Sequence, residues 1–390
     1  MANKFCRQLS NGFKINVQED KLMWSPCCFY SKRVNMYDTE TLKKEMDYAR
    51  SITDWVPECK MCQDLEEKNV AYLNPRQQCT KWIPEESADG DCVHLEMSFD
   101  TKCNAACMSC GSYCSTTWAK FDKKHGRGKH SVPKQIKLLS NIQRKITGFE
   151  YGVTLDSSAT DMSDIHFAKL ISLIPLDKMI TLFLLGGEPF YTKSHIKMLR
   201  HLKETHPDLS KVSLRYQTNG SIYPSDEVLK LWEDYHFINF GVSFDDIGDR
   251  FNYLRWPLKW KKCSNNLVRL MNETDCELHV NSTYSPLNIY YYDELDAWLK
   301  ANIPNDSTGR VRNKMIRPNP CQGDMDLKYT SPKLIEKIYK KYGENHDVVK
   351  VLSNIELDSN WGSMFSYIEE IDKLRRQDWR KTFPEVASCY

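Results

Sequence analysis

The sequence predicts an α/β fold built on a parallel sheet. Short apolar runs that suit strands alternate with longer amphipathic stretches that suit helices from about residue 92 to 320. Six strand-then-helix units in succession favour parallel strands joined by crossover helices. A cysteine-rich segment precedes them, and a purely helical pattern follows them. We therefore expect a small N-terminal domain over 1–85, a β/α domain over 92–320 and a C-terminal helical extension over 321–390.

Individual elements follow from the same patterns. An N-terminal hairpin is expected over 12–18 and 22–26. The β/α strands are predicted at 94–99, 181–185, 211–217, 237–243, 277–283 and 310–316. Their helices are predicted at 133–146, 163–174, 194–205, 225–235, 258–273 and 291–301, and those of the extension at 331–342, 346–354 and 363–377. The tail 388–390 is expected to be mobile, as chain ends commonly are.

Charge and cysteine content narrow the functional class. The 390 residues carry 54 basic and 52 acidic side chains, without a long Lys/Arg run, which argues against a nucleic-acid partner. We see neither a secretory h-region nor an apolar run of membrane-spanning length, so we expect a cytoplasmic protein without a membrane partner. Fifteen cysteines in such a chain favour metal or redox chemistry over disulfides. The oligomeric state is not predicted by these features.

Three cysteines stand at spacing C-x3-C-x2-C directly after the first predicted β/α strand: Cys103, Cys107 and Cys110. A loop leaving a strand can wrap three thiolates around one [4Fe–4S] cluster. Electron-carrier clusters normally use four thiolates, so three would leave one iron open for a substrate or cofactor. The alternative is a zinc site, for which Cys114 or His125 would supply the fourth ligand.

A second motif, Gly186-Gly187-Glu188-Pro189, follows the apolar run 181–185. Two glycines let the backbone approach a ligand closely. Backbone carbonyls and Glu188 can meet an ammonium group, and Pro189 ends further strand pairing. Taken together, the order and spacing of the two motifs resemble the radical S-adenosylmethionine (SAM) superfamily.

That resemblance implies a partial (β/α)6 barrel and a specific chemistry. Cys103, Cys107 and Cys110 would hold a catalytic [4Fe–4S] cluster, and SAM would bind its open iron through amino and carboxylate groups. The segment Gly186–Pro189 would meet the SAM amino group. The enzyme would cleave SAM to a 5′-deoxyadenosyl radical that abstracts hydrogen from a substrate. Ser109 departs from the family pattern, which often has an aromatic residue before the last cysteine.

Further candidate SAM contacts stand at the ends of later strands: Thr218, Asn219, Ser243 and Asp245. Their hydroxyl, amide and carboxylate groups suit a ribose or an amino-acid moiety, and strand ends are where parallel barrels place active sites. Ordinary turn and helix-cap chemistry explains the same residues equally well. Arg255 resembles a family position that reaches the SAM carboxylate. The alternative is a surface arginine.

The N-terminal segment carries its own cysteines, including the chelate Cys59-x-x-Cys62, which suits zinc or a fully ligated [4Fe–4S] cluster. The order cysteine, hairpin, Pro-Cys-Cys, helix, Cys-x-x-Cys, followed by Glu66 and Arg76, resembles the twitch (SPASM-like) domain of a radical SAM subgroup that carries it N-terminally. The ligands implied for a second, auxiliary [4Fe–4S] cluster are Cys6, Cys27, Cys59 and Cys62.

Cys28 is the alternative to Cys27, because neighbouring residues on a strand face opposite sides and one of the two should point into the core. Cys79 and Cys92 are interpreted as plain thiols in the linker before the barrel.

The sequence thus predicts a radical SAM enzyme whose auxiliary cluster transfers electrons, because four thiolates close that cluster to substrate. An external one-electron donor such as flavodoxin or ferredoxin would reduce the catalytic cluster. A small-molecule substrate is favoured slightly, since no leader-peptide-binding domain is recognisable. The alternatives are a peptide- or protein-modifying maturase and a non-enzymatic zinc-binding protein. The substrate, the net reaction and the role of the auxiliary cluster stay open.

Overall fold

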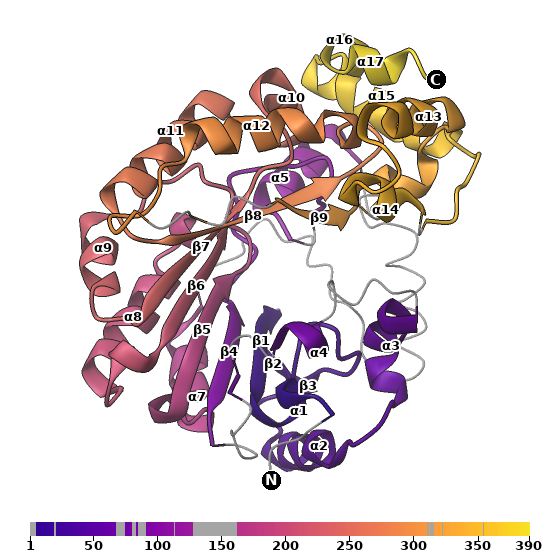
Figure 1. Ribbon diagram of the computed structural model, residues 1–390. Coiled ribbons are helices and arrows are strands. Elements are labelled where there is room, and N and C mark those ends of the chain that lie inside the picture. The colour runs from indigo at the N-terminus through magenta and orange to yellow at the C-terminus, as the bar shows by residue number, and fades with distance from the viewer. Residues whose placement is uncertain are drawn as a thin grey trace. The chain divides into compact units, whose positions relative to one another are not determined.

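The computed structural model describes most of the chain, which falls into two compact units (Figure 1). The first unit comprises 1–102, 140–217 and 224–240, and the second comprises 103–139, 218–223 and 241–390. The described residues are 5–18, 21–67, 75–79, 83–84, 91–112, 114–127, 162–309, 312, 316–321, 323–353 and 355–390. The predicted helix 133–146 lies outside these residues. Among the described residues, no helix is long and apolar enough to cross a bilayer.

The first unit begins with the predicted hairpin. Strand β1 (Gly12–Gln18) pairs antiparallel with β2 (Lys21–Ser25), with Lys14 opposite Ser25. The other N-terminal elements are α1 (Arg7–Asn11), β3 (Val34–Asn35), α2 (Thr39–Ser51), α3 (Lys60–Glu67) and α4 (Pro75–Gln78).

The hairpin is part of the same sheet as the first β/α strands. Strand β1 pairs parallel with β4 (Val93–Ser98), and the strand order in this unit is β3-β2-β1-β4-β5-β6. Strands β5 (Met179–Leu185) and β6 (Ser213–Thr218) continue the sheet in parallel register, with Thr181 opposite Ser213. The predicted boundary near 85–92 falls mostly on residues outside the described ones, so the division into three domains stays a prediction.

Helices α7 (Asp164–Leu173), α8 (Ser194–Thr205) and α9 (Asp226–Trp232) alternate with these strands. Strand β7 (Phe237–Ser243) starts in the first unit and ends in the second. This alternation confirms the predicted α/β class with a parallel β/α sheet. Most residues of β4 and β5 and every second residue of β6 are buried.

The second unit contains α5 (Thr116–His125), α10 (Gly248–Leu254), α11 (Trp260–Glu273), β8 (Glu277–Tyr284), α12 (Tyr292–Asn302) and β9 (Ile316–Pro320). Strands β8 and β9 pair in parallel, with Val280 opposite Ile316. Most of the strand predicted over 310–316 lies outside the described residues, and β9 overlaps that range at Ile316. Pro318 and Pro320 fit this strand because it lies at the edge of the sheet, where backbone N–H groups can stay unpaired.

The C-terminal helical extension is confirmed by α13 (Pro332–Tyr342), α14 (Asp347–Ser353), α15 (Gly362–Arg375), α16 (Trp379–Thr382) and α17 (Pro384–Ala387). The expectation of a mobile tail is wrong. The Tyr390 hydroxyl donates to the Tyr329 carbonyl at 2.7 Å, and Cys389 is buried. Local sequence does not reveal that the chain end packs back on its own unit.

Candidate functional site

The loop Cys103–Cys110 is fixed by backbone hydrogen bonds within the second unit. The Ala106 N–H donates to the Trp256 carbonyl and the Met108 N–H to the Leu254 carbonyl, both at 2.7 Å. The Trp118 indole N–H donates to the Cys107 carbonyl at 2.8 Å. Cys103 and Cys107 are buried, and Cys110 is half-buried. The loop conformation is therefore set by α5 and the end of α10, independently of any ligand.

The thiols of this loop lie in a desolvated environment. Burial raises the pKa of Cys107 to about 12, and the Arg255 guanidinium opposes that shift. The pKa of Cys110 is raised by a contact with Cys114, whose sulfur lies 3.2 Å away, and by burial. Metal ligation by these thiols would release their protons, since the thiolate is the ligand.

No three His, Cys, Asp or Glu side chains in the described part of the chain surround a single-ion site. A [4Fe–4S] cluster places each thiolate on a different iron, so its ligands need not converge on one point. Soft thiolate donors in one loop fit an iron–sulfur group chemically.

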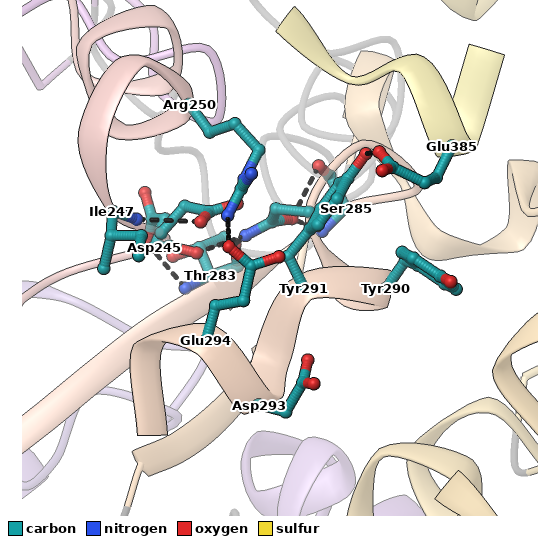
Figure 2. A network of polar contacts seen from close by, with 12 residues as sticks. Asp245, Ile247, Arg250, Thr283, Ser285, Tyr290, Tyr291, Asp293, Glu294 and Glu385 are labelled. Atoms are coloured by element: carbon teal, nitrogen blue, oxygen red, sulfur yellow. Dashed lines mark hydrogen bonds and ion pairs between the residues drawn. The ribbon is translucent and has the colours of Figure 1, made fainter. Parts of the chain in front are cut away.

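Arg255 and Asp245 form a buried ion pair beside the loop. The guanidinium Nη2 donates to Asp245 Oδ1 at 2.8 Å, and its Nε lies 2.8 Å from Oδ2. The Thr283 N–H also donates to Asp245, at 2.7 Å (Figure 2). The remaining arm, Nη1, lies 3.8 Å from the Cys107 sulfur. Arg255 is only 7% exposed, so the interpretation as a surface arginine is wrong.

The turn Thr218-Asn219-Gly220 also contacts the cysteine loop. The Asn219 amide donates to the Asn104 side-chain oxygen at 2.9 Å and lies 4.0 Å from the Cys103 sulfur. The Asn104 amide in turn donates to the Ser221 hydroxyl at 2.8 Å. Thr218 accepts from the Gly220 N–H, as in an ordinary turn. The sequence pattern did not single out Asn104, although it lies inside the cysteine motif.

A pocket opens next to these groups in the second unit. It is small and is lined by Met108, Ser109, Asp245, Leu254, Thr283, Ser285 and Met325. Met108 and Ser109 stand between Cys107 and Cys110 in the loop. Ser243 is half-buried at the end of β7 and does not line the pocket. The pocket therefore presents polar groups and two methionines next to the cysteine loop, which suits a small polar ligand.

A second polar network borders Asp245 (Figure 2). Arg250 pairs with Asp246 at 2.9 Å and with Glu294, and it lies over the Tyr291 ring at 4.0 Å. The Tyr291 hydroxyl donates to Glu385 at 2.6 Å. Burial raises the pKa of Asp246 to about 7, while Arg250 lowers it. This network ties α10 to α12 and to the C-terminal extension.

In the first unit, the Gly-Gly-Glu-Pro segment docks on the backbone that leaves β4. Gly187 N–H donates to the Asp100 carbonyl at 3.2 Å, and Glu188 N–H donates to the Lys102 carbonyl at 2.8 Å. A Cβ on Gly187 would lie 2.1 Å from the Lys102 oxygen. Gly186 has φ +131°, and Glu188 is buried with its carboxylate accepting from the Phe190 N–H. Close backbone packing, rather than ligand approach alone, therefore requires Gly187.

The N-terminal cysteines gather in one region of the first unit. Burial raises the pKa of Cys27 to about 12, with a further contribution from Cys62. Burial likewise raises the pKa of Cys62 to about 12, with smaller contributions from Cys59 and Cys28. The charge of Cys27 also contributes to the raised pKa of Cys6. All four predicted ligands thus interact electrostatically through Cys27 and Cys62.

Two details differ from the sequence-based interpretation. Cys27 and Cys28 lie in a turn after β2, so the strand argument for placing them on opposite faces does not apply, and both are half-buried. Cys79, interpreted as a plain linker thiol, is hydrogen-bonded to Cys6, and that contact is the largest cause of the raised pKa of Cys6. Cys79 thus contacts the N-terminal group, and it also packs with Ile83 and Cys92 in a small apolar cluster.

Arg76 links the cysteine-bearing segments. Its Nε donates to Glu66 Oε1 at 2.7 Å and its Nη2 to Glu66 Oε2. Its Nη1 donates to the carbonyl of Phe5, the neighbour of Cys6, at 3.0 Å. The guanidinium also lies over the Phe5 and Trp55 rings, at 5.1 and 5.0 Å. The Glu66 and Arg76 of the sequence motif thus hold α3, which carries Cys62, against the Cys6 segment.

Comparisons with known proteins gave structural matches only. No family model matches the chain, and no curated protein matches it. Native anSMEcpe with bound AdoMet and Kp18Cys peptide matches with 14% identity and a TM-score of 0.40, over 64% of this chain and 58% of that one.

Streptococcus suis SuiB bound to precursor peptide SuiA matches with 12% identity and a TM-score of 0.35, over 68% of this chain and 49% of that one. SuiB bound to S-adenosylmethionine matches with 13% identity and a TM-score of 0.32, over 69% and 50%. The match thus covers between about half and three-fifths of the length of these proteins.

Proposed function

We propose that this chain is a radical SAM enzyme in which Cys103, Cys107 and Cys110 hold a [4Fe–4S] cluster. The observation that carries the proposal is a loop with three thiols, pinned next to a buried guanidinium and a pocket. With SAM at the open iron, the cluster would supply the electron that cleaves SAM to methionine and a 5′-deoxyadenosyl radical.

The protein's own groups would orient SAM and shield the site. Asp245 fixes the Arg255 fork, leaving one N–H arm for the Cys107 thiolate. A cation at this position favours ligation by thiolate over thiol. We assign the SAM contacts to Gly186, Gly187, Glu188, Pro189, Thr218, Asn219, Ser243, Asp245 and Arg255.

We further propose an auxiliary [4Fe–4S] cluster on Cys6, Cys27, Cys59 and Cys62, with a role in electron transfer. Support comes from the electrostatic contacts among these thiols and from the Arg76–Glu66 pair that joins their segments. A flavodoxin or ferredoxin is the proposed electron donor. The proposed substrate is a small molecule, and the polar groups and methionines that line the small pocket beside the loop support this choice.

The test begins with anaerobic purification and analysis of iron and sulfide. The wild-type chain should contain enough iron and sulfide for two [4Fe–4S] clusters. It should form 5′-deoxyadenosine from SAM once a reductant is added. Changing Cys103, Cys107 or Cys110 to Ala should abolish this product and leave one cluster. Cys263→Ala, which removes a buried thiol on α11, is the control and should retain both. Zinc without sulfide in the wild type would refute the proposal.

The substrate class is tested with the wild-type enzyme. Cell extract is separated into a low-molecular-mass fraction and a peptide fraction. Each fraction is added to the enzyme together with SAM and a reductant. A small-molecule substrate should raise 5′-deoxyadenosine formation only in the first fraction. Stimulation by the peptide fraction alone would instead identify a peptide-modifying maturase.

A further inference from the structure

We propose that Arg375, the last residue of α15 in the C-terminal extension, is a positioning residue that holds the cysteine loop and raises the reduction potential of its cluster. The proposal rests on the function proposed above. It assigns a role to α15 (Gly362–Arg375), which no sequence motif connects to the cysteines.

Arg375 contacts the loop on both sides of Cys107. Its Nη2 donates to the Ala106 carbonyl at 2.7 Å, and its Nη1 lies 3.3 Å from the Met108 sulfur. The Tyr367 hydroxyl, two turns earlier on α15, donates to the Met108 carbonyl at 3.1 Å. Two side chains of one helix thus bind the residues that flank the second cysteine ligand.

The Arg375 charge is buried among aromatic rings. Its guanidinium carbon lies 4.7 Å from the centre of the Trp118 ring, 4.8 Å from Trp256 and 5.3 Å from Phe121. Rings stabilise a desolvated cation through their quadrupoles without neutralising its charge. Trp118 is the same residue that donates to the Cys107 carbonyl, so the aromatic cage and the loop form one packed structure.

Arg375 differs from Arg255 in its counter-charge. Arg255 is paired with Asp245, whereas no carboxylate in the described part of the chain forms an ion pair with Arg375. Asp372, one turn earlier, is engaged by the Tyr253 hydroxyl and the Trp379 N–H, both at 2.7 Å. Arg375 and Asp372 interact only at longer range, so the guanidinium reaches the loop without a carboxylate bonded to it.

A buried cation in a low-dielectric environment favours whichever state of a nearby group carries more negative charge. Reduction adds an electron to a cluster, so a cation beside its ligand stabilises the reduced form and raises the reduction potential. The distance is short, because Arg375 donates to the carbonyl of Ala106, the residue that precedes Cys107.

The experiment compares Arg375→Met, which keeps the apolar stem, with Arg375→Lys, which keeps the charge but loses the planar fork. Arg376→Met is the control, because it removes the neighbouring charge from an exposed position. Iron and sulfide content is measured first. The reduction potential is then followed by electron paramagnetic resonance, using the signal that changes on addition of SAM.

At a fixed potential, Arg375→Met should shift the reduced-to-oxidised ratio of that cluster at least tenfold toward oxidised, which is about 59 mV for a one-electron couple. The ratio in Arg375→Lys should stay much closer to the wild-type value. The ratio in Arg376→Met should equal the wild-type value. An unchanged potential in Arg375→Met, or equal shifts in the Met and Lys variants, would overturn the proposal.

If Arg375→Met does not fold, Arg375→Gln replaces it, since the Gln amide can still donate to the Ala106 carbonyl without the charge. The same tenfold shift is then expected, and its absence counts against the proposal in the same way. A wild-type protein without a SAM-responsive cluster would refute the proposed function itself. If the wild-type protein has a SAM-responsive cluster but the Gln or Met variant has the same reduction potential, only the role of Arg375 is refuted.

Discussion

The backbone N–H of Glu188 donates to the carbonyl oxygen of Lys102 at 2.8 Å, immediately before the first cysteine of the loop. The contact is possible only because Gly187, the preceding residue, has no side chain. A Cβ at this position would lie 2.1 Å from the same oxygen and 2.5 Å from the carbonyl carbon. The Gly-Gly-Glu-Pro segment therefore packs against Lys102, the residue that precedes Cys103.

We predict that Gly187→Ala lowers both the iron content of the catalytic site and the affinity for SAM. Even one methyl group would displace the backbone at Lys102 and shift the start of the cysteine loop. Iron analysis and SAM binding by equilibrium dialysis would detect this. Gly362→Ala is the matched control, because its Cβ would meet nothing nearer than 3.7 Å. Wild-type iron and SAM binding in Gly187→Ala would contradict the expected role of this contact.

The Asp245–Arg255 pair gives a prediction about stability. Asp245→Asn would leave the Arg255 guanidinium buried without its counter-charge, which typically costs about 3–5 kcal/mol. Urea unfolding should detect the loss, together with weakened SAM cleavage. Arg380→Met, which breaks an exposed pair with Glu369, should cost no more than about 1 kcal/mol. A similar small cost for both variants would show that the buried pair is dispensable.

Arg76→Met should selectively lower the iron content of the N-terminal site. The change removes the bonds of Arg76 to Phe5 and to Glu66, so α3 and its Cys62 would separate from the Cys6 segment. Iron per chain and the electron paramagnetic resonance signal would be compared with wild type. Lys60→Met, which breaks an exposed pair with Asp64 on the same helix, is the control. Equal iron loss in the two variants would argue against a specific role of Arg76.

The Asp246 carboxyl makes stability depend on pH. Burial raises its pKa in the folded protein to about 7, whereas the ordinary value is 3.8. Between these values the folded state binds a proton that the unfolded state has released, so this group's contribution to stability falls as pH rises. Between pH 5 and 8 the loss amounts to about 2–3 kcal/mol.

Asp246→Asn cannot titrate and should lack that part of the pH dependence. Urea denaturation of both proteins at pH 5 and pH 8 would measure the difference. The variant should gain stability relative to wild type at the higher pH. Parallel pH profiles for the two proteins would show that Asp246 stays ionised in its pair with Arg250 throughout.

Cys114→Ala distinguishes a three-thiolate cluster from a four-ligand zinc site. Cys114 lies 3.2 Å from the Cys110 sulfur and is the nearest additional thiol in the loop. In the proposed enzyme the variant should keep its iron, its sulfide and its SAM cleavage, because SAM rather than Cys114 completes the site. In a zinc site the same change would remove a ligand and release the metal. Metal analysis of the purified variant decides between them.

Local patterns in the sequence predicted the α/β class and most elements accurately. Strand β7, for example, spans Phe237–Ser243 as expected. These predictions were possible because a buried parallel strand is mostly apolar and a helix that covers a sheet is amphipathic. Both properties can be recognised in short stretches of sequence. Strand β9 contains Pro318 and Pro320, and only the structure shows that this strand lies at the edge of the sheet, where proline is tolerated.

The sequence by itself determined the chemistry of the candidate sites. The thiols of Cys103, Cys107 and Cys110 are close along the chain, so their spacing alone restricts which metal group they suit. Only the tertiary structure decided what surrounds them. Arg375 reaches Ala106 across 269 positions, and Cys79 reaches Cys6 from a segment that looked like a linker. Spacing along the chain records short-range geometry, whereas the partners that set charge and position are brought in by packing of distant segments.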